Sequence, residues 1–205
     1  MDLEQLDHTD GDDNTAGIQQ YIYIGKKADI AHFPKPIVDD SSSTSGILEN
    51  LVTITDNFIM KSGKSFQRVY VTLEAGGITC TLQGNMDGKS FKNQLDFSHP
   101  GNRAQVMGLA QYAKNGDLVF IVPEQDGTAR VIGHDAYPAK MTACTVDTGK
   151  KTTDDKAAKF TFESVRKGPA PIFQGQILLT GGAVGSGLVD PDNNSYQDIV
   201  FLPGS

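Results

Sequence analysis

The fold is decided by residues 97–133, which read FSHPGNRAQVMGLAQYAKNGDLVFIVPEQDGTARVIG. Within this stretch four apolar residues recur with the i, i+3, i+4, i+7 spacing of one helical face, namely Val106, Leu109, Ala110 and Ala113. Ser98 and Pro100 are residue types that favour a helix start, and Asn115-Gly116 favours a helix end. The spacing therefore predicts an α-helix over about 100–114, with its apolar face against a sheet.

Strand signals follow this helix directly. Leu118-Val119-Phe120-Ile121-Val122 is an unbroken apolar run, too short for a helix and rich in β-forming residues, which predicts a buried strand. Residues 123–127 (PEQDG) have turn composition, and residues 128–133 return as another strand. The central stretch thus predicts one helix packed on a sheet that continues on both sides.

Outside the central stretch, short segments of alternating or continuous apolar residues predict further strands. They lie at 21–24, 47–55, 66–73, 78–82, 91–97, 141–146, 160–165 and 172–179. The segments 66–73 and 78–82 alternate well and are separated by Glu74-Ala75-Gly76-Gly77, which predicts a hairpin between them. We therefore expect a β-rich fold (all-β or α+β), an antiparallel β-sandwich or barrel with one packed α-helix and extended terminal arms.

Composition along the chain predicts three regions. Residues 1–17 are acidic with few apolar partners and are expected to form a flexible N-terminal arm. Residues 18–180 would form the β-sandwich domain, with a Ser-rich flexible linker at 39–46, and 181–205 a Gly-rich C-terminal extension. The apolar patch Ile199, Val200, Phe201 and Leu202 is a candidate assembly arm, and the alternative is an edge strand of its own domain.

Charge and length exclude some functions. The chain has 205 residues with 18 basic and 25 acidic side chains, a formal net charge of −7, so we expect no non-specific grip on nucleic-acid phosphates. We expect no membrane segment and no secretory signal, and therefore a protein made in the cytoplasm. Cys80 and Cys144 are interpreted as two small buried thiols, while a disulfide between them stays open.

A search for catalytic or metal-binding residues yields weak candidates only. His134-Asp135 lacks an activated nucleophile and is interpreted as a surface turn. Residues 190–194 (DPDNN) resemble part of a calcium loop without its Gly and Glu, and Lys61 to Ser65 resembles a phosphate loop without its glycines. We therefore predict no catalytic residue, no cofactor and no metal. The expected protein is a building block rather than an enzyme.

The order of these elements resembles the tail tube (major tail) proteins of long-tailed bacteriophages. The resemblance rests on segments 21–36, 66–82, 102–133 and 160–164, the last of which precedes Gly168-Pro169-Ala170-Pro171. It implies a virion protein of the tail, assembled in the host cytoplasm, whose copies join edge to edge as rings, usually of six. The rings would stack head to tail around a channel, contact other tail proteins, and let DNA pass without specific binding.

Two other interpretations remain open from the sequence. One is a different virion component, such as a tail-completion or head–tail joining protein. The other is a monomeric β-sandwich that binds a ligand such as a carbohydrate, although the absence of Trp argues against it.

Overall fold

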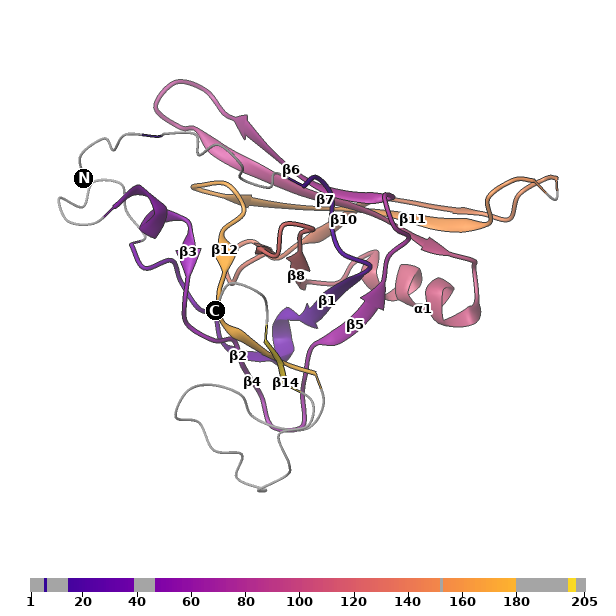
Figure 1. The fold of residues 1–205 in the computed structure, drawn as a ribbon, viewed down its shortest axis with the longest axis horizontal. Helices are drawn as coiled ribbons and strands as arrows, with labels where there is room; N and C mark the ends of the chain where they lie inside the picture. Colours follow the sequence, from indigo (N-terminus) through magenta and orange to yellow (C-terminus); the bar gives the residue numbers. More distant parts are fainter. Residues whose placement is uncertain (1–5, 7–14, 39–46, 152, 180–198, 202–205) are drawn as a thin grey trace.

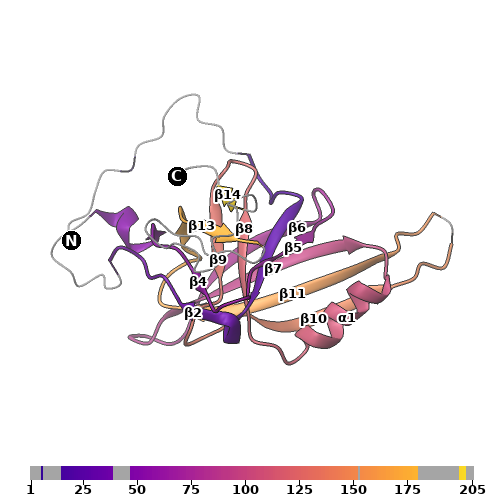
Figure 2. The same ribbon diagram turned by 90° about the horizontal axis from the view of Figure 1, so that it is seen from below.

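The computed structural model describes residues 6, 15–38, 47–151, 153–179 and 199–201, and it forms a β-sandwich with a single α-helix in that part of the chain (Figures 1 and 2). The predicted flexible regions at 1–17, 39–46 and 181–205 lie largely or wholly outside the described residues. The strands are β1 (Tyr21–Lys26), β2 (Ile30–His32), β3 (Thr53–Ile54), β4 (Ile59–Met60), β5 (Gln67–Tyr70), β6 (Gly76–Gln83), β7 (Ser90–Pro100), β8 (Leu118–Pro123), β9 (Ala129–Ile132), β10 (Lys140–Asp147), β11 (Ala157–Arg166), β12 (Ile172–Phe173), β13 (Gln176–Leu178) and β14 (Ile199–Phe201). The helix is α1 (Ala104–Ala113), and two short 3₁₀ turns are η1 (Lys27–Asp29) and η2 (Leu48–Leu51).

One layer is a four-stranded antiparallel sheet in the order β10-β11-β7-β6. Its strands are long and extend beyond the rest of the domain, the β6–β7 hairpin on one side and the β10–β11 hairpin on the other (Figure 1). Its inner face carries Phe97, Phe160 and Phe162, and the ring of Phe120 from the second layer lies 4.6 Å from that of Phe162 and 6.3 Å from that of Phe97. These aromatic side chains form the centre of the first hydrophobic core.

The second layer is a six-stranded sheet in the order β3-β12-β9-β8-β1-β5. All six residues of its central strand β8 are buried, because both faces of the strand are covered. Phe120 faces the first core, whereas Val119 and Ile121 face a second core that contains Phe58 and Phe66. Burial on two faces is the physical reason for the unbroken apolar run, so the prediction of a buried strand is confirmed.

The helix α1 carries the predicted apolar face. Val106 and Ala113 are buried, and Leu109 and Ala110 are partly buried against the first core. The predicted helix start was wrong, because β7 continues through Ser98 to Pro100, which is opposite Ala157 of β11. Arg103 is the N-cap residue and provides no side-chain capping bond. Pairing with a long neighbouring strand outweighed the local capping signal.

The predicted hairpin between 66–73 and 78–82 is wrong, although both segments contain strands. β5 pairs with β1, whereas β6 pairs with β7, so the two strands belong to different sheets. Val71 is fully buried, and Thr72 N–H donates to Ser98 O at 2.8 Å where the chain crosses between the layers. The alternation of apolar and polar residues identified the strands, but packing into the two hydrophobic cores decided which strand each one pairs with.

Two predicted strands are shorter than expected. In 47–55 only β3 is a strand, parallel to β12, and it follows η2, where Thr53 Oγ1 donates to Glu49 O at 2.8 Å. The segment 172–179 is divided into β12 and β13, which belong to different sheets. Gly175 lies between them, and a Cβ there would approach the Phe173 ring at 2.7 Å. The chain therefore bends where only glycine fits.

Candidate functional site

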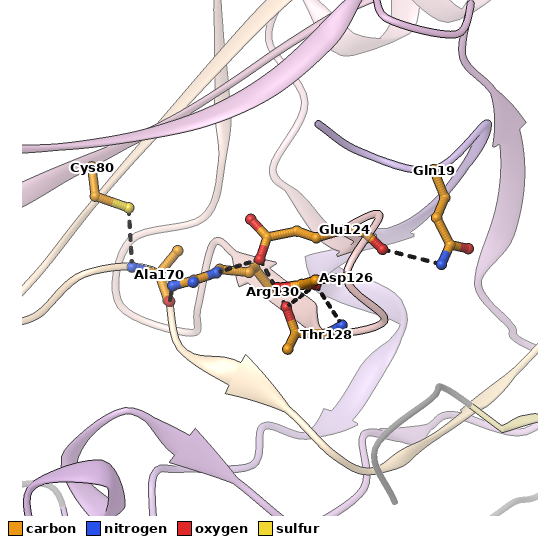
Figure 3. Close-up of polar contacts among 7 residues, drawn as sticks. All are labelled: Gln19, Cys80, Glu124, Asp126, Thr128, Arg130 and Ala170. Atoms are coloured by element: carbon orange, nitrogen blue, oxygen red, sulfur yellow. Dashed lines mark hydrogen bonds and ion pairs between the residues drawn. The ribbon is translucent and has the colours of Figure 1, made fainter. Parts of the chain in front are cut away.

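A polar cluster connects the two layers of the sandwich (Figure 3). Arg130 of β9 pairs with Glu124 at 3.0 Å and donates to Ala170 O at 3.2 Å, while Ala170 N–H lies 3.4 Å from Cys80 Sγ of β6. Thr128 Oγ1 lies 2.8 Å from a carboxylate oxygen of Glu124 and from one of Asp126, so its single hydroxyl hydrogen is donated to one of the two. The polar groups of the cluster satisfy one another, so we interpret it as a structural brace.

Arg130→Met is expected to lower the free energy of unfolding by about 1–3 kcal/mol, because it leaves the partly buried Glu124 carboxylate without its cation. Urea denaturation of the variant checks this value. Lys64→Met is the matched control: its ion pair with Asp29 is longer, 3.8 Å, and more exposed, so it should cost at most a few tenths of a kcal/mol. Equal losses in the two variants would show that the Arg130 pair is not a brace.

His134, the histidine considered as a candidate in the sequence, has structural contacts. His134 Nε2 lies 3.1 Å from Val165 O, and its ring contacts Tyr137 edge-on at 5.8 Å. Asp135 pairs with Lys27 at 3.4 Å. Residues 190–194 lie outside the described part of the chain, and within that part no three His, Cys, Asp or Glu side chains are arranged to hold a metal.

A basic groove of about 1400 Å³ lies beside His134. Its lining comes from the end of β1, η1 and β2, from the end of α1, and from the ends of the strands β7 and β11. It contains seven of the chain's 18 Lys and Arg residues against two Asp, although only 23 of 205 residues line it. The basic residues are Lys26, Lys27, Lys35, Lys61, Lys89, Arg166 and Lys167.

Most of this positive charge is available to a ligand. Within the described ranges, no carboxylate lies at ion-pair distance from five exposed lysines, Lys26, Lys35, Lys61, Lys89 and Lys167. The Lys26 ammonium lies 5.8 Å from the centre of the Tyr112 ring, over its face. The groove can therefore bind an anionic ligand, a property that the net charge of −7 conceals.

Sequence reasoning missed this groove for a definite reason. Lys26 and Lys35 flank β2, whereas Lys61, Lys89 and Lys167 come from three distant loops. No run of more than two basic residues contributes to the groove, and the pairing of β1 with β8, of β2 with β4 and of β7 with β11 brings these segments together. Lys61 belongs to the loop that resembled a phosphate-binding motif, but its position depends on tertiary structure.

The four-stranded sheet has two open edges, β6 and β10, each eight residues long. No described segment pairs with the outer side of either strand. Leu82 at the end of β6 is 51% exposed, and Met86 in the following turn is 86% exposed. Long open edges with exposed apolar side chains are templates for pairing with another chain.

Each open edge carries one of the two cysteines. Both thiols are free, with Cys80 of β6 half-buried and Cys144 of β10 exposed. The prediction of two buried thiols is therefore wrong for Cys144, because β10 has no neighbour on its outer side within the described structure. Partial burial nevertheless raises the pKa of the Cys144 thiol above its ordinary value.

The outer face of the four-stranded sheet is polar and carries both basic and acidic side chains. Lys92 of β7 pairs with Glu163 of β11 at 3.1 Å. Asp96 accepts hydrogen bonds from Gln94 and Thr161, both at 2.6 Å. This face therefore presents hydrogen-bonding groups to water, and its lysines Lys92 and Lys159 are matched in number by Glu163 and Asp96.

The candidate assembly arm is described only in its backbone. Ile199, Val200 and Phe201 form β14, which pairs with β13 of the same chain, and Leu202 lies outside the described residues. Within one chain, the segment is therefore an edge strand of its own domain, which is the alternative interpretation from the sequence. A role in assembly stays a prediction.

Comparison with protein-family models, with curated protein sequences and with solved structures gives no match for this chain. Among the described residues there is no helix with the length and apolar character needed to cross a membrane. The functional proposal therefore depends on the surfaces described above.

Proposed function

We propose that the protein is a structural subunit of a bacteriophage tail tube, which self-assembles into stacked rings around a channel for DNA in the virion tail. The observation that carries this proposal is the pair of open edges, β6 and β10, on opposite sides of one antiparallel sheet. The β-sandwich with a single helix, which the sequence resemblance also implied, supports it.

Strand direction makes edge-to-edge assembly geometrically simple. The order β10-β11-β7-β6 is antiparallel at every step, so the two edge strands run in opposite directions. When β6 of one copy meets β10 of the next, the new pair is antiparallel like all the others. The contact uses two different surfaces, so it repeats from copy to copy and closes as a ring when the rotation allows.

A closed sheet of this kind has an inner and an outer face. The inner side of each four-stranded sheet is occupied by its own core, which leaves the polar face with the Lys92–Glu163 pair for the channel. Because Lys92 and Lys159 share that face with Glu163 and Asp96, its opposite charges balance in number, and the channel would exert little net attraction on DNA phosphates. Such a surface suits a conduit through which DNA passes without specific binding.

Negative-stain electron microscopy of the purified full-length protein, combined with sedimentation velocity, tests the proposal. Rings with a central hole, or tubes built from them, are expected above micromolar concentration. A protein that sediments as a monomer and shows no rings at any concentration or salt would overturn the proposed function.

A further inference from the structure

The acidic N-terminal segment is complementary in charge to the basic groove. Residues 1–14 (MDLEQLDHTDGDDN) contain six carboxylates and no Lys or Arg. We propose that the groove binds this segment of a second copy of the chain. The inference rests on the proposed function, in which it supplies the contact between stacked rings.

The groove has the chemistry that an acidic peptide requires. Its five exposed lysines without carboxylate partners share the groove lining with apolar side chains, the buried Ile30 and the half-buried Phe33. Lysine ammonium groups on long side chains can reach carboxylates spread along an extended peptide. Leu6 of the segment is 87% exposed in its own chain, so its side chain is available to contact the apolar residues of the groove lining.

The positions of segment and groove favour a head-to-tail contact. The acidic segment precedes the first residue of β1, Tyr21, whereas Lys26 and Lys27 at the other end of that strand line the groove. A contact between opposite ends of one strand in two copies is heterologous, so it repeats along a stack instead of closing as a symmetric dimer. Each ring would present several such contacts at once, which strengthens stacking through multivalency.

A nucleic acid is the competing anionic ligand, and the observations favour the peptide. The groove also contains Asp117 and Asp135, and the chain as a whole carries −7, so a single strand with one charge per nucleotide meets more repulsion than a peptide with six carboxylates in residues 1–14. The acidic segment is also present at the same concentration as the groove in every assembly.

The test measures binding of a fluorescent peptide of residues 1–14 to the full-length protein by anisotropy at low salt. We expect saturable binding that weakens as salt rises. A triple variant, K35E/K61E/K89E, should weaken binding at least tenfold. The control K114E/K150E/K151E makes the same charge change at exposed lysines outside the groove and should bind like the unmodified chain.

Three further measurements decide the occupant. A peptide in which the six carboxylates are replaced by Asn and Gln should not bind. A single-stranded oligonucleotide of matched length should bind more weakly than the acidic peptide, and tighter groove-dependent binding of the oligonucleotide would overturn the proposal. Full-length K35E/K61E/K89E should form rings that do not stack, and adding D7K/D10K/D12K to it should restore stacking.

The outcome separates this inference from the proposed function. Rings that form while neither peptide binding nor stacking depends on the groove lysines would overturn the inference alone. Groove-dependent peptide binding by a chain that never forms rings would support the groove as a peptide site and overturn the tail-tube proposal. Groove-dependent binding within one chain, shown by monomers that exclude added peptide until residues 1–14 carry the lysine substitutions, would overturn the second copy as partner.

Discussion

Cys144→Pro is expected to abolish ring assembly while leaving the domain folded. Gly101 N–H donates to Lys156 O, so the odd-numbered residues of β7, including Phe97, direct their backbone groups to β11. Phe97 is opposite Phe160, whose backbone groups therefore point back to β7 and away from Cys144. Proline at Cys144 thus removes an N–H from the open edge, the donor that a neighbouring copy would use.

Two controls accompany this variant. Cys144→Ser keeps the N–H and should assemble like the unmodified protein. Thr145→Pro removes an N–H that points to Lys159 of β11, so it should destabilise the domain itself. Circular dichroism and sedimentation, measured together, separate folding from assembly. Rings formed by a folded Cys144→Pro protein would show that β10 is not a joining edge.

Phe120→Ala is expected to cost about 3–5 kcal/mol of folding free energy, since its fully buried side chain contacts aromatic residues of the other sheet. In a domain of this size such a loss should lower the melting temperature by about 6–20 °C. Thermal denaturation followed by circular dichroism measures it. Met107→Ala on the exposed side of α1 is the control and should change little. Similar melting temperatures for both variants would contradict a core centred on Phe120.

Local patterns in the sequence predicted those parts of the fold that depend on local burial. Val106 and Ala113 lie on the predicted helix face, and the run Leu118 to Val122 is buried as expected. Pairing partners were not predictable in the same way. β5 and β6 are adjacent in sequence yet belong to different layers, because each strand completes a different sheet.

The surfaces used in the functional proposal were even less visible in the sequence. The basic groove is built from lysines that are far apart in the chain, such as Lys26, Lys89 and Lys167. The open edges follow from the strand order, which no periodicity encodes. The acidic composition of residues 1–17 was evident from the sequence, but the basic groove that complements its charge became apparent only when the groove residues were placed in space.

The two cysteines report on the register of the proposed ring contact. Cys144 is opposite Phe160, which is opposite Phe97 of β7. Cys80 is opposite Asn93, which lies four residues from Phe97 on β7. A stagger of four residues per four strands, about 13 Å along and about 19 Å across the sheet, tilts the strands by about 35°, as closed barrels require. In that register Cys80 of one copy is opposite Cys144 of the next, about 5.5 Å apart at Cα, within disulfide range.

Oxidative cross-linking of the unmodified protein with diamide therefore tests edge-to-edge assembly most directly. Diamide takes two hydrogens from the paired thiols as the disulfide forms. Because the pKa of Cys144 is raised, its thiolate is scarce at neutral pH, and cross-linking should become faster as pH rises. We expect a ladder of oligomers on a non-reducing gel that ends at the number of subunits in the ring and disappears in Cys80→Ser and in Cys144→Ser. Oxidised protein that remains monomeric at every pH and concentration would contradict the pairing of β6 with β10.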